Sequence, residues 1–177
     1  IRALGTQAIS ALTSDQIDAL TTNQMTALLT QQLAAMDTSQ IQSIAPTDLA
    51  VLSSAQLVGL NATRVAALTS DQIQAMTTAQ FAAMSTVQIA ALTSEQMAVM
   101  QNADLAALTS TQAAILSSDQ LGALTSAQIQ AIEAVDLRSI STLALSALNS
   151  EQIAALTSVQ IANLTNAQVA SLSSDQI

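Results

Sequence analysis

The octad IAALTSEQ, Ile89–Gln96, decides the fold because the rest of the chain repeats it with variations. It returns as IAALTSVQ at Ile153–Gln160 and as LGALTSAQ at Leu121–Gln128. When the octads are counted from Ile1, the first position is always apolar and the fourth is always Leu, Met or Ile. Such an unbroken period is typical of a stacked repeat array. We therefore expect one octapeptide-repeat solenoid over residues 1–177, with about 22 repeats, as part of a longer array.

We number the eight positions as slots, with Ile89 in slot one. Slot five is Thr, Ser, Asn or Asp in 17 of 22 octads, and slot eight is Gln in 16. This is a capping pattern, because the slot-five side chain accepts from a free amide of the first turn and Gln reaches back to the cap amide. Pro46 lies in slot six, the first helical position, where proline costs nothing. Of the 12 acidic residues, 11 fall in slots five to eight, where the helix dipole favours negative charge.

Each octad is therefore predicted to hold one helix of about seven residues, roughly 10 Å long. The chain should turn in the extended conformation of the next N-cap, because Gly5, Gly59 and Gly122 are the only glycines. Slots one and four should point inward. Slot three is Ala, Gly or Ser in 18 of 22 octads and should allow close backbone approach. The predicted fold is an all-α superhelical solenoid of short capped helices, one per 8-residue repeat.

Two alternative folds fit the period less well. One continuous helix would turn about 800° per octad, so its apolar stripe would drift around the surface. A β-strand would place slots one and four on opposite faces, because they lie an odd number of residues apart. The strong preference for Ala also argues against a β-solenoid.

Composition excludes several classes of partner. The net charge is −9 and the chain has no Lys, whereas nucleic acids and anionic membranes need clustered cations. The apolar runs are far shorter than a membrane-spanning helix requires. We expect neither nucleic-acid binding nor membrane insertion. The absence of Cys excludes disulfides.

The sequence predicts no catalytic, cofactor-binding or metal-binding residue. There is no His, Cys, Lys, Tyr or Trp, so the usual nucleophile and base pairs are missing, and we expect no enzyme. Asp48, Asp104 and Asp136 share slot eight but lie many repeats apart. Phe81 and the six Met residues occupy slots one or four, and are interpreted as core packing.

Three features of the sequence are candidates for binding a partner. The stretch from Ile41 to Arg64 is the least regular, and Arg64 is the only cation in slot eight, where the helix dipole disfavours it. Sequence drift is our interpretation, with a binding feature as the alternative. Apolar residues in slot seven suggest a line of lateral contacts: Val87, Val135, Leu143 and Val159. Stacked Thr and Ser in slots five and six resemble the ice-binding faces of antifreeze solenoids, although capping already accounts for these hydroxyls.

The run LTSDQI and its variants resemble the ALTxxQ octad arrays of very large bacterial surface and secreted proteins, often described as adhesin-like. The run LTSDQ is also similar to the LTPEQ that begins each TAL-effector repeat, but the rest of that longer unit is missing, so DNA binding is not implied. The first resemblance implies export from a bacterium and exposure to the medium. Together with the predicted solenoid, it leads us to expect a stiff extracellular rod or filament segment of a bacterial surface protein. Self-association, end to end or side by side, is the expected partnership. The alternative is a solenoid that binds a peptide or glycan.

Overall fold

The computed structural model describes residues 1–176 and divides into two compact units, Ile1–Ala91 and the residues from Leu92 onward. Each unit is described by itself, and the predicted single solenoid over residues 1–177 stays a prediction. Residues 1–176 contain 21 α-helices and no β-strand, which confirms the all-α class with one helix per octad. The helices of the first unit are α1 Thr6–Ser10, α2 Ser14–Asp18, α3 Thr22–Thr26, α4 Thr30–Leu33, α5 Thr38–Gln42, α6 Pro46–Ala50, α7 Ser54–Leu57, α8 Ala62–Ala66, α9 Ser70–Ala75, α10 Thr78–Ala83 and α11 Thr86–Ala90. Those of the second unit are α12 Ser94–Val99, α13 Asn102–Ala106, α14 Ser110–Ala113, α15 Ser118–Gly122, α16 Ser126–Ala131, α17 Ala134–Leu137, α18 Thr142–Leu145, α19 Ser150–Ala154, α20 Ser158–Asn163 and α21 Asn166–Ala170.

The predicted caps are confirmed, because each of these helices has its N-cap in slot five. In α9, the Thr69 hydroxyl accepts from the N–H of Gln72 at 3.2 Å, and Gln72 Oε1 accepts from the N–H of Thr69 at 2.9 Å. Thr69 itself is extended, with φ −75° and ψ 161°. No residue in 1–176 has a positive φ. The chain therefore turns through the extended N-caps, as predicted from the scarcity of glycine.

The helices are shorter than predicted, with four residues in α4 and six in α9, whereas we expected about seven. The reason lies in slot four. Met76, the slot-four residue after α9, has already left the helix, with φ −60° and ψ 147°. Its N–H still bonds to the carbonyl of Ile73 at 3.3 Å. The last turn is thus opened so that the slot-four side chain points inward and the chain leads directly into the next cap.

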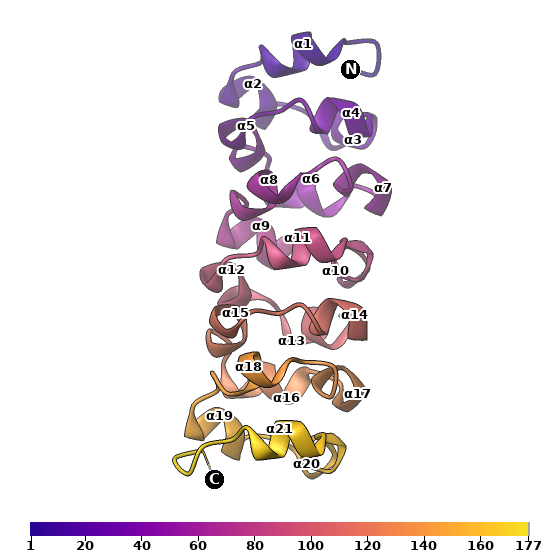
Figure 1. Ribbon diagram of the computed structural model, residues 1–177. Coiled ribbons are helices and arrows are strands. Elements are labelled where there is room, and N and C mark those ends of the chain that lie inside the picture. Colours follow the sequence, from indigo (N-terminus) through magenta and orange to yellow (C-terminus); the bar gives the residue numbers. More distant parts are fainter. Residues whose placement is uncertain (177) are drawn as a thin grey trace. The chain divides into compact units, whose positions relative to one another are not determined.

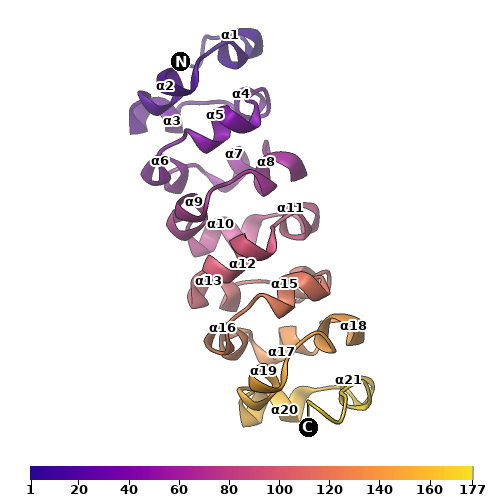
Figure 2. The same cartoon turned by 90° about the vertical axis from the view of Figure 1, so that its left-hand side faces the viewer.

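Within each unit, a helix packs against the third helix that follows it. Figure 1 shows the helices of each unit in successive layers joined by short links. Figure 2 shows α3, α6 and α9 one above another in the first unit, and α13, α16 and α19 in the second. Side-chain hydrogen bonds between layers join residues 25 to 31 positions apart. One turn of the solenoid therefore takes between three and four octads, a number that the eight-residue period did not give.

The inward assignment of slots one and four is confirmed. Slot one is buried from Ile9 to Leu145, and slot four from Leu28 to Leu156. Phe81 is fully buried, and the Met residues are buried with it, so both belong to the core as predicted. Burial of one large apolar side chain contributes about 1.5–3 kcal/mol. Each octad buries its apolar side chains only against neighbouring octads, so a single octad is not stable alone.

Close backbone approach through slot three is clearest at Gly59. A Cβ atom added to Gly59 would lie 2.5 Å from the backbone oxygen of Thr30 in the preceding turn. At Gly122, which is in slot two, the nearest such atom is the oxygen of Ala147 at 3.6 Å, an ordinary contact. Gly59 is therefore the glycine on which the spacing of two turns depends.

Candidate functional site

The side chain that joins successive turns is the slot-eight Gln. Gln72 is buried, and while its Oε1 accepts from Thr69, its Nε2 donates to the carbonyls of Ile41 at 2.7 Å and Ile44 at 2.8 Å. Those acceptors are the slot-one and slot-four carbonyls at the end of a helix in the preceding turn. The same pair of slots accepts from Nε2 of Gln32, Gln40, Gln56, Gln80, Gln88, Gln128, Gln160 and Gln168.

This double use explains why slot eight is Gln and not Glu. Either residue can accept from the cap amide in a capping box, but only an amide can also donate. Each donated bond contributes about 1 kcal/mol net, and an unmade bond to a buried carbonyl costs about 1–3 kcal/mol. From the sequence we predicted only the capping role of Gln, and not its bond to the preceding turn. The signal that could have found it was the rarity of Glu in slot eight.

Where Asp replaces Gln, the bridge between turns changes partner. Asp48 is buried, and its Oδ1 accepts from the hydroxyl of Thr22, 26 residues earlier, at 2.7 Å. Asp136 is buried in the second unit and accepts in the same way from the hydroxyl of Ser110. A carboxylate has no proton to offer a carbonyl. The slot-six hydroxyl of the preceding turn therefore becomes the donor, and the two turns stay linked.

Arg64 is the third variant of slot eight. Its Nε donates to the carbonyl of Met36, 28 residues earlier, at 2.6 Å. That carbonyl occupies slot four, so Arg64 reaches the acceptor position that Gln reaches elsewhere. The dipole of its own helix disfavours Arg64 in this slot, but the carbonyl ends of the helix in the preceding turn attract a cation. Arg64 thus keeps the slot-eight joint, by which we mean the hydrogen bond from the slot-eight side chain to the preceding turn.

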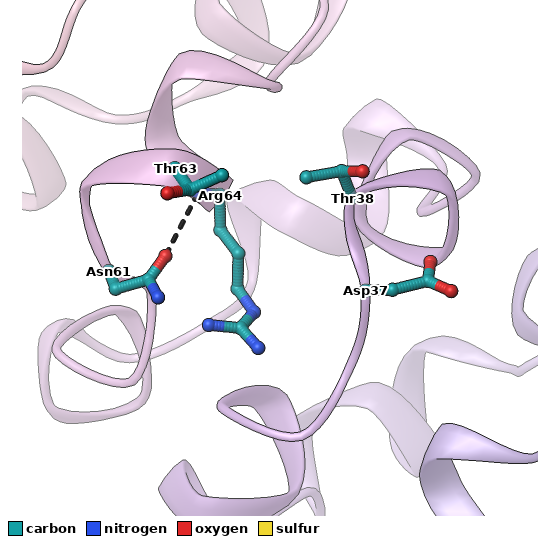
Figure 3. Close-up of a pocket in the computed structure, with 5 residues that line it drawn as sticks. All are labelled: Asp37, Thr38, Asn61, Thr63 and Arg64. Carbon is teal, nitrogen blue, oxygen red and sulfur yellow. Dashed lines mark hydrogen bonds between the residues drawn. The ribbon is translucent and has the colours of Figure 1, made fainter.

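A pocket of about 280 Å³ opens beside this arginine, lined by Asp37, Thr38, Asn61, Thr63 and Arg64. Asn61 caps α8, and Asp37 caps α5, which packs against α8. In Figure 3 the guanidinium of Arg64 lies between Asn61 and Asp37, and the methyl groups of Thr38 and Thr63 face each other near the first carbons of the Arg64 side chain. The pocket therefore combines one cation with two small apolar walls.

The polar groups of this pocket are held in fixed orientations. Asn61 Oδ1 accepts from the N–H of Arg64 at 3.0 Å, which leaves Nδ2 as the outward group of that amide. Asp37 Oδ1 accepts from the N–H of Gln40 at 2.8 Å. In Figure 3 the carboxylate of Asp37 points away from Arg64. The donors of Arg64 and Asn61 thus converge, while the negative charge of Asp37 is engaged at the start of α5.

Other positions that the sequence singled out lie apart from this pocket. Val87, Val135, Leu143 and Val159 in slot seven are all well exposed, as a surface line requires, and their lateral contacts stay a prediction. Cap hydroxyls such as that of Thr93 accept from an amide of their own helix. In residues 1–176 no group of three His, Cys, Asp or Glu side chains could hold a metal ion. Of the helices described, none is long and apolar enough to cross a membrane.

Comparison with known proteins agrees with the octad pattern. A model of the ALTTAQ repeat family matches residues 1–30, 41–78, 73–102, 97–132 and 129–166. These matches cover most of the chain, including the irregular stretch from residue 41 to 64. No curated protein matches the sequence.

Proposed function

The chain belongs to the ALTTAQ repeat family, and from this premise we propose that it is a structural segment, a stiff rod or filament part of an extracellular, adhesin-like protein at a bacterial surface. The observation that carries the proposal is the slot-eight joint. Gln80, for example, caps its own helix and donates to the carbonyls of Leu49 and Leu52 in the preceding turn. Turns that share both a core and such bonds resist bending, because each depends on its neighbours.

Composition supports the extracellular part of the proposal. The chain is acidic, with a net charge of −9, and it contains neither Cys nor Lys. A large net charge keeps an exposed array soluble. Immunogold labelling of intact cells that carry the protein tests the location, and gold particles confined to permeabilised cells would contradict it.

The same composition supports a role without catalysis. The chain has no His, Cys or Lys, so general bases and nucleophiles of the usual kinds are missing. Hydroxyls and carboxylates are present, but examples such as Thr69 and Asp48 form structural hydrogen bonds. Thr69 caps its helix, and Asp48 accepts from a hydroxyl of the preceding turn. The proposed role therefore depends on shape and surface.

Self-association end to end is the partnership that we propose for this segment. In the second unit, Ile161 and Val169 are 54% and 48% exposed, whereas Leu121 in the same slot is fully buried. Ile161 and Val169 line an apolar depression of about 480 Å³ together with Ile153, Leu164 and Leu172. A further turn of the same repeat, whether it comes from the continuation of the array or from a second copy, would cover these side chains as internal turns do, and its slot-eight Gln residues would donate to the carbonyls of Ile161 and Leu164.

Electron microscopy of the purified chain over a range of concentrations tests this proposal. We expect filaments whose length grows with concentration. Val169→Asp should shorten them, because a charge in the apolar depression opposes docking, while circular dichroism stays unchanged. Val159→Asp is the matched control, since Val159 is 65% exposed in slot seven and away from the depression. Uniform short particles at every concentration would contradict end-to-end association, and a loss of filaments in Val159→Asp alone would indicate side-by-side association instead.

A further inference from the structure

We propose that the pocket beside Arg64 binds the carboxylate of a small organic acid, a role that goes beyond the structural function. Arg64 needs only its Nε to join the turns, through the 2.6 Å bond to the carbonyl of Met36. The two Nη groups lie at the other end of the guanidinium, in the pocket of about 280 Å³. The bond to Met36 also restricts the orientation of the guanidinium. A planar guanidinium held in this way matches the two oxygens of a carboxylate.

A second donor converges on the same position. Asn61 Oδ1 is engaged by the N–H of Arg64 at 3.0 Å, so the Nδ2 group is presented outward. Both donors come from α8 or its cap and keep a fixed spacing, because the cap is part of the helix start. An anion bound here would meet donors that are already oriented, which reduces the entropy lost on binding.

The remaining walls select among anions. The Thr38 and Thr63 methyl groups face each other beside the first carbons of the Arg64 side chain, which makes that end of the pocket apolar and suited to a short carbon stem. Asp37, whose Oδ1 bonds to the N–H of Gln40, places one negative charge on the far wall. That charge opposes a dianion such as phosphate more strongly than a monocarboxylate. The volume lies just below the usual range of ligand pockets, which suits only a small ligand. The geometry therefore points to a small monocarboxylate.

Nuclear magnetic resonance offers a direct test, because the chain has only three arginines, Arg2, Arg64 and Arg138. Their Nε–Hε signals should give one resonance each, with Arg2 and Arg138 as internal controls. The probes are acetate and propionate, titrated at constant ionic strength so that the field of the acidic chain stays screened. We expect a saturable shift of the Arg64 signal and of the Asn61 side-chain amide, with propionate binding at least as well as acetate. Phosphate should bind more weakly than either.

The array itself supplies variants that keep the fold. Arg64→Gln introduces the residue that bonds to the slot-four carbonyl in most other octads, as Gln88 does to Leu60. Its thermal unfolding should match that of the parent, while the response of Asn61 to acetate weakens about tenfold or more, the loss expected for charge-assisted hydrogen bonds. Asn61→Thr keeps a capping hydroxyl and should weaken binding by a smaller factor.

Three results would overturn the proposal. The first is an equal, unsaturated drift of all three arginine signals up to about 0.1 M acetate, which is general screening. The second is an Asn61 response that survives in Arg64→Gln. The third is a shift of the Arg64 signal with protein concentration alone, because the carboxylate would then come from another copy of the chain. The titrations are made in the Val169→Asp background, in which filament formation should be reduced, so that the proposal and the structural function fail independently.

Discussion

Two adjoining stretches of the first unit, Ile41–Arg64 and Val65–Ala91, have one backbone plan but different joints between turns. In the regular stretch each slot-eight residue is Gln, and both the slot-one and slot-four carbonyls of the preceding turn receive its Nε2. In the irregular stretch Gln56 makes the regular joint, whereas Asp48 accepts from a hydroxyl and Arg64 donates to one carbonyl. Within these two stretches the apolar slots one and four are kept throughout, while slot eight varies among side chains that bridge two turns.

The largest effect is expected from Gln72→Glu in the regular stretch. Glu can still accept from Thr69, but its second oxygen would face the carbonyls of Ile41 and Ile44 in a buried position. We expect a loss of about 3 kcal/mol or more in the free energy of unfolding, measured by urea denaturation. Gln24→Glu is the matched control, because Gln24 forms the same capping box with Thr21 but is exposed. An equal loss of unfolding free energy in the two variants would show that the bonds from Gln72 to the preceding turn do not contribute to stability.

Gly59→Ala probes the tight point of the irregular stretch. The added methyl group would lie 2.5 Å from the Thr30 oxygen, a backbone atom that cannot swing away. We expect a loss of about 1–3 kcal/mol, as for overpacked cores. Gly122→Ala should instead be neutral or stabilising by up to about 1 kcal/mol, because Gly122 ends a helix and has ordinary contacts. A thermal midpoint that falls equally for both substitutions would contradict the close approach.

Much of the fold follows from the sequence because its causes are local. Thr69 and Gln72 identify a helix start by themselves, since both partners of a capping box lie within four residues. The inward direction of slots one and four follows from their apolar character. Helix length was predicted less well. Met76 belongs to a helix by pattern, but it is drawn into an extended conformation by the need to enter the next cap.

The joint and the pocket could not be predicted, because both depend on how many octads make one turn. Gln72 meets Ile41 across 31 residues, and Arg64 meets Met36 across 28. Any turn of two, three or four octads is compatible with the eight-residue period. Capping alone already accounted for Gln in slot eight, so the sequence did not indicate a second bond from that side chain. Asp37 and Asn61 both lie in slot five, for which the sequence predicted only a capping role, and the packing of α5 on α8 brings them to one pocket.

Asp48→Gln converts one joint of the irregular stretch into the regular kind. The new amide should donate to the carbonyls of Ile17 and Leu20, which stand 31 and 28 residues earlier, the spacing that Gln72 uses. The bond from Thr22 is lost, so the net gain should be about 1 kcal/mol. A double-mutant cycle sharpens the result, because Thr22→Ala should cost less in the Asp48→Gln background than in the parent. Strict additivity would show that the hydroxyl bridge does not contribute.

The smallest effect concerns the acids of the first helical turn. Other octads carry acids in slot seven, whereas residues 41–64 carry none there. Glu95 is fully exposed, and its pKa is lowered by a hydrogen bond from its own backbone N–H and then by one from the Thr93 hydroxyl. A lowered folded-state pKa favours the folded protein above the ordinary Glu pKa, and this advantage is lost as pH falls through the lowered value. Glu95→Gln should therefore reduce the thermal midpoint slightly at neutral pH and not in strong acid, as a pH series of melting curves would show.

The extended N-cap link, in which residues 1–176 adopt no positive φ, bears on how the gene can change. An eight-codon duplication or deletion leaves each link stereochemically ordinary, and every slot-eight Gln then finds an equivalent pair of carbonyls one octad away. Length can therefore vary by recombination without loss of folding. The exceptions are pairs matched across a turn, such as Gly59 with Thr30, or Asp48 with Thr22. An octad inserted between the two members of such a pair would separate them and should lower stability.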